Sequence, residues 1–395
     1  MDFGFRISYV GRRCSRLRLR NKKSDIRHLK SLFLPLVLVF LVQGEETARW
    51  RLQYFYDEPR ATFVIADLKF PSPKRGIAVG AIAEGGHVKP MSALTSDGGE
   101  HWSLAPLKEP GESLYFLNDS LGWLVTSKGL WQTEESGRSW RKLKAPAGLD
   151  QVHFVDANHG WAVGIHKHVY ETKNGGADWT ELAALENLNS SGEYTHFAWI
   201  EFANPEVGLI GGWSKPPRRG EQRLPDWLDP ETAERRREWP QLGILLDTRD
   251  AGKTWTPSTM SLFGQITTAK LSPEGWGMGL IEFSDSFDWP SEVFFLDWKT
   301  AKQKRVYREK DRKVTDLAIA GPSGPVYLGA IEHFGKLQQL PIPRKVKIIR
   351  SDDAEHWSEM PVDYRAVARR VILATAGPGN AWAATDTGMI LKLTP

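Results

Sequence analysis

The hydrophobic positions of this chain fall in short runs that are bounded by turn residues, and these runs recur as a unit. A unit holds one apolar run, a second run that opens with glycine and an aromatic residue, and a third run that ends in threonine. The two clearest units have their runs at 114–116, 122–125 and 129–133, and at 152–154, 160–164 and 168–172. Short apolar runs between turn residues are typical of β-strands, so each unit predicts three strands joined by turns.

The third run leads into a phrase with the skeleton Ser/Thr-x-Asp-x-Gly-x-x-Trp. A short acidic or amide side chain can accept hydrogen bonds from N–H groups of its own turn, and glycine supplies a positive φ. The tryptophan then begins a fourth strand, where its ring can pack between neighbouring sheets. Four copies carry Thr95 and Trp102, Thr133 and Trp140, Thr172 and Trp179, and Thr248 and Trp255; a decayed fifth copy has Arg350, Asp352, Ala354 and Trp357. These copies resemble the Asp box of the BNR-repeat β-propellers.

The spacing of the copies indicates how many four-stranded blades the chain forms. Trp102, Trp140 and Trp179 are 38 and 39 residues apart, which is typical of a propeller blade. The 76 residues from Trp179 to Trp255 contain only one set of strands, so the excess is interpreted as an insertion at 214–240 in the fourth blade.

The remaining spacing predicts three more blades and a closed ring. The 102 residues that lead to Trp357 contain two sets of strands, around 275–279 and 326–329. One further set ends at 389–393 without a fourth strand, whereas 50–56 reads as a strand without a blade of its own. Pairing these two segments would leave few free strand edges. We therefore predict an all-β fold, a seven-bladed β-propeller with Asp-box hairpins, closed by an N-terminal strand.

The first 44 residues differ from the propeller that we place at 45–395. Residues 1–30 hold ten Lys or Arg against two Asp, and an uncharged apolar run follows at 31–42. This run is shorter than the roughly 20 residues of a membrane-spanning helix. Small residues follow it, as a signal peptidase site requires. We expect 1–44 to be an export signal, with a mature protein that begins near Glu45 in the periplasm or outside the cell; an uncleaved membrane anchor is the alternative.

Removal of this leader changes the net charge of the protein. The whole chain carries +4, but the leader contributes ten positive and two negative charges, so the remainder carries about −4. A slightly acidic body gives no electrostatic reason to bind nucleic acid. Cys14 is the only cysteine and leaves with the leader, so the mature chain forms no disulfide and has no thiol nucleophile. We expect no cofactor and no metal.

Long connections between second and third strands are the most informative feature for function. We place them at 81–92, 214–240, 280–291 and 330–345, in blades one, four, five and six. In a propeller these connections lie on the face opposite the Asp boxes. Because function concentrates on loops that a rigid scaffold holds, this face is where we expect a partner or substrate.

The candidate binding residues lie in or beside these connections. Glu282 and Glu332 occupy equivalent positions of two similar segments, and a facing carboxylate pair could serve glycoside hydrolysis or hold a cation. Inherited structure is the interpretation that we prefer for this pair. The insertion in blade four mixes arginine with tryptophan, which favours protein recognition over a merely solvated charged surface. The full set of candidates is Arg218, Arg219, Trp227, Arg235, Arg236, Glu282, Asp285, Trp289, Glu332 and His333; we assign no catalytic and no metal-binding residue.

The segment at 154–179 narrows the class of propeller. It contains Phe-Val-Asp, Gly-Trp-Ala-Val-Gly and Thr-x-Asn-Gly-Gly-x-x-Trp, and it resembles the photosystem II stability and assembly factor family of seven-bladed propellers. The resemblance extends over roughly 50–395 and is clearest in blades one to four. It implies a non-enzymatic assembly factor outside the cytoplasm that binds a protein partner, such as a membrane complex. The lipobox of some members is absent.

A second class of Asp-box propellers, the sialidases and xyloglucanases, gives the alternative function. Sialidases carry a Phe/Tyr-Arg-Ile-Pro motif ahead of their boxes, and the near match here, at 5–8, lies in the leader. Their catalytic residues therefore do not transfer to this chain. We expect an exported, protein-binding propeller that is not an enzyme; a glycan-active enzyme remains the alternative, with a glycan as its partner.

Overall fold

The computed structural model describes residues 48–215, 240–283, 289–300, 302–332, 344–363 and 365–395. The chain divides into Met1–Glu45 and Glu46–Pro395, and every described residue belongs to the second part. The leader predicted at 1–44 therefore lies outside the described residues.

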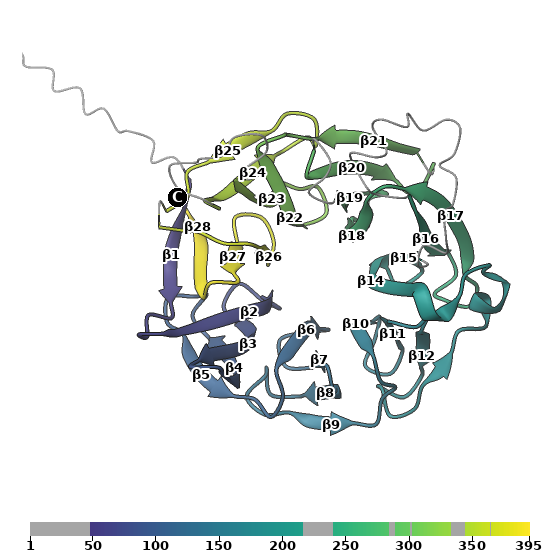
Figure 1. The fold of residues 1–395 in the computed structure, drawn as a ribbon, viewed down its shortest axis with the longest axis horizontal. Helices are drawn as coiled ribbons and strands as arrows, with labels where there is room; N and C mark the ends of the chain where they lie inside the picture. Colours follow the sequence, from purple (N-terminus) through teal and green to yellow (C-terminus); the bar gives the residue numbers. More distant parts are fainter. Residues whose placement is uncertain (1–47, 216–239, 284–288, 301, 333–343, 364) are drawn as a thin grey trace, which may run out of the picture. The chain divides into compact units, whose positions relative to one another are not determined.

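Seven antiparallel sheets of four strands each stand around a common axis (Figure 1). Blades 1 to 3 are β2 (Ala61–Lys69), β3 (Gly76–Glu84), β4 (His87–Thr95) and β5 (Ser103–Pro106); β6 (Gly111–Phe116), β7 (Gly122–Thr126), β8 (Gly129–Thr133) and β9 (Arg141–Leu143); and β10 (Leu149–Phe154), β11 (Gly160–Gly164), β12 (Val169–Thr172) and β13 (Thr180–Glu181). Blades 4 and 5 are β14 (Thr195–Asn204), β15 (Val207–Ser214), β16 (Gln241–Thr248) and β17 (Thr256–Leu262); and β18 (Gln265–Leu271), β19 (Trp276–Glu282), β20 (Ser291–Asp297) and β21 (Lys302–Tyr307). Blades 6 and 7 are β22 (Arg312–Ile319), β23 (Val326–Glu332), β24 (Val346–Ser351) and β25 (Ser358–Met360); and β26 (Val371–Thr375), β27 (Ala381–Thr385), β28 (Met389–Thr394) and β1 (Arg49–Phe55).

The structure confirms the predicted all-β, seven-bladed propeller. Two short 3₁₀ helices, η1 (Ala183–Asn187) and η2 (Gly192–Tyr194), join blades 3 and 4, and the described residues contain no α-helix. The second strand of a blade lies between two strands of its own sheet and two neighbouring sheets. This position explains why β7, β11 and β27 are buried at every residue and why their sequences read as continuous apolar runs.

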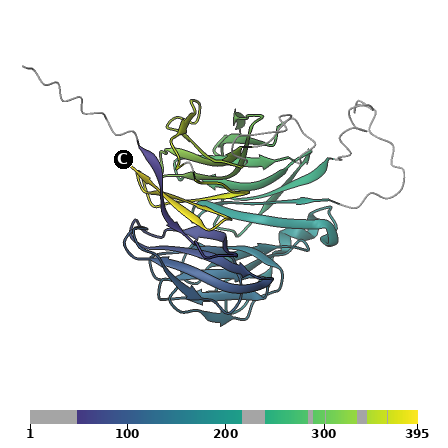
Figure 2. The ribbon, with the colours of Figure 1, turned by 60° about the vertical axis from the view of Figure 1, so that its left-hand side comes forward.

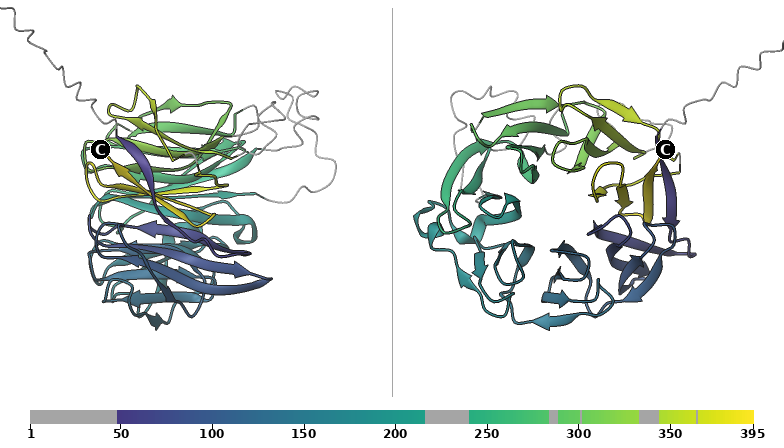
Figure 3. Two further views of the ribbon diagram at one scale, coloured as in Figure 1. Left: turned by 90° about the vertical axis from the view of Figure 1, so that its left-hand side faces the viewer. Right: turned by 180° about the vertical axis from the view of Figure 1, so that it is seen from behind.

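The N-terminal strand closes the ring, as the sequence predicted. β1 pairs with β28 in antiparallel register, from Arg49 with Thr394 to Phe55 with Met389. The side views show β1, in purple, running alongside the yellow C-terminal strands (Figures 2 and 3). Blade 7 is therefore assembled from both ends of the propeller, and β1 covers the edge that β28 would otherwise expose.

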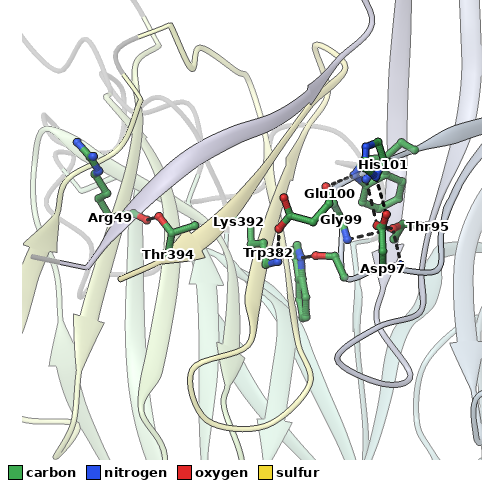
Figure 4. A network of polar contacts seen from close by, with 11 residues as sticks. Arg49, Thr95, Asp97, Gly99, Glu100, His101, Trp382, Lys392 and Thr394 are labelled. Carbon is green, nitrogen blue, oxygen red and sulfur yellow. Dashed lines mark hydrogen bonds and ion pairs between the residues drawn. The ribbon is translucent and has the colours of Figure 1, made fainter. Parts of the chain in front are cut away.

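Side chains of blade 7 also contact the turn of the repeated phrase in blade 1, which we call a box turn (Figure 4). The Trp382 indole N–H donates to the carbonyl oxygen of Gly98 at 3.0 Å, and Lys392 Nζ lies 2.8 Å from Glu100 Oε1. The Trp382 ring also stacks on Phe70 of blade 1, with centroids 3.5 Å apart and planes 4° from parallel. Both apolar and polar contacts thus join blade 7 to blade 1.

The same aromatic contact recurs between other blades. The second-strand tryptophan of one blade stacks on a phenylalanine of the next, as Trp123 does on Phe154 and Trp161 on Phe202, at 3.7 and 4.7 Å. The box tryptophan of that next blade then meets the phenylalanine edge-on, as Trp255 meets Phe202 at 6.0 Å. Trp255 also meets Trp161 of blade 3 edge-on at 6.1 Å, so this box tryptophan packs between neighbouring sheets as the sequence predicted.

The turns that carry the repeated phrase contain the predicted hydrogen bonds. In the first copy, Thr95 Oγ1 accepts from the Gly99 N–H at 2.9 Å and Asp97 Oδ1 accepts from the His101 N–H at 3.0 Å (Figure 4). The threonine bond recurs at Thr133, Thr172 and Thr248. Each of these turns is therefore closed by its own side chains.

The decayed fifth copy uses a different aspartate from the one that we aligned. Asp353, not Asp352, accepts from the backbone N–H groups of Glu355 and His356, at 2.8 and 2.7 Å. Asp352 instead pairs with Arg350 at the surface. One residue is missing between the aspartate and the tryptophan in this copy, so the alignment that was fixed on Trp357 placed the aspartate one position too early.

The predicted long connection at 81–92 in blade 1 is also wrong. β3 and β4 continue as a paired hairpin until Glu84 faces His87, and only Gly85 and Gly86 form the turn. Both glycines have positive φ, 56° and 84°, as a tight two-residue hairpin turn requires. The extra residues therefore lengthen the strands and do not form a loop.

Candidate functional site

The face opposite the box turns carries the connections between second and third strands, and we call it the loop face. The long connections leave blades 4, 5 and 6 after Ser214, Glu282 and Glu332. Most of the candidate binding residues fall in these connections. Those outside the described residues are Arg218, Arg219, Trp227, Arg235, Arg236, Asp285 and His333.

Glu282 and Glu332 end the second strands of adjacent blades, at the equivalent positions that the sequence suggested. Each carboxylate pairs with a lysine: Glu282 with Lys313 at 3.3 Å, and Glu332 with Lys347 at 3.2 Å. Lys347 also binds Glu359 at 2.5 Å. Within the described ranges, no group of three or more His, Cys, Asp or Glu side chains could hold a metal ion. The structure therefore places both glutamates in partly buried ion pairs.

Trp289, the third described candidate, is half-buried beside two cations. The Arg308 guanidinium carbon lies 4.1 Å from the centre of its ring, and Lys310 Nζ lies 4.8 Å from it. Arg308 also binds Glu292 at 2.7 Å. A tryptophan that is stacked with cations on a partly exposed surface can contribute to a protein interface.

A central channel, which the sequence did not reveal, runs through the ring. It consists of a cavity of about 430 Å³ and one of about 300 Å³, and residues from the innermost strands of all seven blades line both. The two cavities share the lining residues Lys69, Gln151, Lys270 and Leu373. The larger cavity includes Glu282 and opens at the loop face, whereas the smaller one includes Phe70 and Pro71, which follow β2 at the box face.

Charged side chains occupy the middle of the channel. Lys270 binds Glu201 at 2.9 Å, and Lys69 binds Asp67 at the same distance. Burial lowers the pKa of Lys270, but Glu201, Asp316 and Asp67 outweigh that effect and leave the pKa raised. Burial also raises the pKa of Asp316, although a backbone N–H and nearby cations oppose the shift. This central network contains cations and anions in similar number, so the middle of the channel is polar but internally compensated.

Two of these carboxylates also hold neighbouring blades together. Asp67 Oδ2 accepts from the backbone N–H of Leu114 in blade 2, and Asp316 Oδ2 accepts from that of Leu373 in blade 7, both at 2.8 Å. Each aspartate follows a one-residue shift in the register of its inner strand. Because a β-bulge redirects the side chain that follows it, the bulge aims these carboxylates along the ring.

His153 lines the smaller cavity, and its pKa lies far below the ordinary value for histidine. Its ring lies against Tyr115 at 4.6 Å and Phe202 at 5.0 Å. Burial and the nearby Lys270 lower its pKa to about 3. The imidazole is therefore neutral at physiological pH and adds no charge to the channel.

Comparison with known proteins identifies one curated relative. The Photosystem II assembly protein Ycf48 of Thermosynechococcus vestitus is 23% identical over 297 residues, which span 69% of this chain and 79% of that protein. No protein-family model matches the chain.

Solved structures share the propeller fold across most of the chain. YCF48 bound to D1 peptide aligns with a TM-score of 0.57 at 15% identity, over 87% of this chain and 100% of that chain. YCF48 from Cyanidioschyzon merolae gives 0.57 at 17% identity, over 88% and 98%. The WD40 propeller domain of Doa1 gives 0.53 at 10% identity, over 87% and 97%. At these identities the likeness shows the fold alone.

Proposed function

We propose that this chain is an exported, non-enzymatic propeller that binds a protein partner and acts as an assembly factor in the manner of Ycf48. The observation that carries this proposal is the sequence similarity to Ycf48, which extends over most of that protein and does not depend on a single repeated blade. One YCF48 structure holds a D1 peptide. We therefore propose that the partner contributes a peptide segment, and that it belongs to a membrane complex.

Removal of the blade-4 insertion tests this function. Ser214 pairs with Leu242, so replacement of 215–240 by Asn-Gly rejoins the two strands through a three-residue connection, Asn-Gly-Gln241. The full chain, immobilised, should enrich one membrane protein from a detergent extract of its own organism. The shortened variant should lose that protein while it unfolds at the same temperature, because the excision leaves every blade strand in place. Equal capture by both chains would contradict the assignment of the insertion, and no enrichment by the full chain would contradict the function.

The proposed export depends on the leader at 1–44. Within the described part of the chain, no helix has the length and apolarity needed to cross a membrane. We propose that the mature protein begins near Glu45, and N-terminal sequencing of the protein from its native source tests this. Intact Met1 on a cytoplasmic protein would contradict export.

The glycan-active alternative requires Glu282 and Glu332 to be catalytic, which substitution of either residue can test. If the chain hydrolyses glycans through these carboxylates, Glu282→Gln or Glu332→Gln should abolish release of sugar from sialosides or xyloglucan. Our proposal expects no hydrolysis by the parent chain. It also expects normal partner capture by both variants, because each glutamate forms an ion pair with a lysine of this chain.

A further inference from the structure

The mouth of the channel at the loop face is asymmetric. The inner strands of blades 1 to 6 shift register at the same place, and the six residues at these shifts all line the cavity of about 430 Å³. They are, in blade order, Ala66, Glu112, Asp150, Ala198, Thr267 and Thr315. Two carboxylates therefore stand side by side on blades 2 and 3, and an alanine flanks them on either side. Because alanine ends at Cβ, the space beside the carboxylates is not filled from these two positions.

The charge of this carboxylate pair is incompletely compensated. Two other acidic groups that line the cavity, Asp67 and Glu282, each bind a lysine, and Asp316 accepts hydrogen bonds from two backbone N–H groups. Asp150 contacts the imidazole of His196. Among the described residues, Glu112 forms no ion pair; the backbone N–H of Ser127 lowers the pKa of its carboxyl. Burial and the charge of Asp150 raise the pKa of Glu112, which is the response expected of two acids that lack a cation between them.

Blades 2 and 3, which carry the acids, have short connections between their second and third strands. β7 ends at Thr126 and β8 begins at Gly129, and β11 ends at Gly164 and β12 begins at Val169. The long connections belong to blades 4, 5 and 6. The connection from blade 3 to blade 4 is longer and packs against the β11–β12 turn, where Lys167 Nζ donates to the Leu188 carbonyl at 2.8 Å. A ligand can therefore approach Glu112 over blade 2 without a long connection of that blade in its path.

The size of the cavity suits a side chain or a short peptide segment. Its volume of about 430 Å³ lies within the range of roughly 300 to 1,000 Å³ that is typical of ligand pockets. Hydroxyl and amide groups line it between the charges, including Ser113, Gln151 and Thr268. The oxygen atoms of such groups can accept hydrogen bonds from those N–H groups of an ammonium or guanidinium that do not face a carboxylate.

We propose that this mouth binds a cationic side chain of the protein partner, a lysine or an arginine, between Glu112 and Asp150. The cation would remove the repulsion between the two carboxylates, and the flanking alanines would leave room for its aliphatic stem. This inference rests on the proposed function in one respect, namely that the ligand belongs to a protein.

A direct binding measurement tests the site without the native partner. The probe is N-acetyl-trilysine amide, titrated into the full chain in an isothermal calorimeter at low ionic strength, with the corresponding trinorleucine and triglutamate peptides as comparisons. The variants are Glu112→Gln, Asp150→Asn and the double substitution. The matched control is Glu134→Gln, which removes an exposed glutamate of the same blade at the box face.

The expected result is binding of trilysine but not of trinorleucine or triglutamate. Each single substitution should weaken the affinity about fivefold and the double substitution at least tenfold, whereas Glu134→Gln should leave it unchanged. Unchanged circular dichroism and melting of the variants would establish that they fold. Absence of trilysine binding, or equal binding by the double variant and the parent, would overturn the site.

Partner capture separates the failure of this site from the failure of the proposed function. If the double variant retains the partner that the parent enriches, the function stands and the cationic contact is refuted. If the parent enriches no partner, the proposed function fails, whereas the trilysine titration still decides whether the mouth recognises a cation.

Discussion

Closure of the ring by β1 makes Trp50 the residue on which a quantitative prediction can be built. Its side chain is 1% exposed in the core between blades 6 and 7. The ring meets Tyr327 edge-on, with centroids 5.7 Å apart, and the indole N–H points to Met360 Sδ at 3.4 Å. The backbone N–H of Trp50 also donates to the Pro361 carbonyl at 2.8 Å. The residue therefore joins the N-terminal strand to a blade distant in the sequence.

Trp50→Ala removes the buried ring and keeps the backbone bonds of the strand. Large-to-small substitutions of buried tryptophan cost about 3–5 kcal/mol, because both the transfer of apolar area and the residual cavity oppose folding. This loss is a large fraction of the roughly 5–15 kcal/mol that stabilises a typical domain. Phe55→Ala provides the control on the same strand: Phe55 is 41% exposed, so its loss should cost about 1 kcal/mol or less.

Equilibrium unfolding in urea, followed by far-ultraviolet circular dichroism, measures both variants without relying on the fluorescence of the tryptophan that is removed. The dependence of the free energy on urea should stay constant between the proteins if only native-state stability changes. The reasoning would be refuted if Trp50→Ala cost under about 1 kcal/mol, or if Phe55→Ala cost as much as Trp50→Ala.

Two further predictions concern a box glycine and the channel histidine. Gly252 has a φ of 77°, and an added Cβ would lie 2.1 Å from Trp161 Cζ2, so Gly252→Ala should cost about 2 kcal/mol or more in the same urea assay. At Gly85 nothing lies within 4 Å of an added Cβ, so Gly85→Ala should cost about 1 kcal/mol from its positive φ alone. Equal costs for the two variants would contradict the packing argument. Because the pKa of His153 is lowered to about 3, the unfolded chain binds its proton first as pH falls below about 6.5, and stability is lost from there toward pH 3. In His153→Phe the free energy of unfolding should therefore fall less between pH 6.5 and 5 than it does in the parent. Replacement of the exposed His87 is the control and should leave this pH dependence as it is in the parent. If His153→Phe showed the same pH dependence as the parent, His153 would not be the group responsible.

The sequence indicated the repeated unit because local chemistry determines it. Thr95 and Gly99 form their turn through bonds within eight residues, so the phrase can be recognised wherever it recurs. Each blade then follows from the apolar runs between the turns. Ring closure was also predictable, since β28 lacked a neighbour and 50–56 lacked a blade.

The two wrong predictions, the long connection in blade 1 and the aspartate of the fifth copy, both relied on the number of residues between recognisable positions. A hairpin that lengthens its strands and a long loop contain the same number of residues, so Gly85 and Gly86 were the signal that distinguishes them in blade 1. In the fifth copy, aligning the repeats on Trp357 concealed a one-residue deletion, and only the hydrogen bonds assign the turn to Asp353.

Only the tertiary structure decided what lies in the channel. Ala66-Asp67-Leu68 and Thr315-Asp316-Leu317 share a pattern that a comparison of the inner strands could have found. Nothing in either triplet, however, shows that the aspartates bind neighbouring blades or face cations on other strands. The same holds for Glu112 and Asp150, which are 38 residues apart in the sequence and become neighbours because each lies at the register shift of an inner strand. The local pattern determines each blade, whereas the closed ring alone brings one residue from every blade to a common axis.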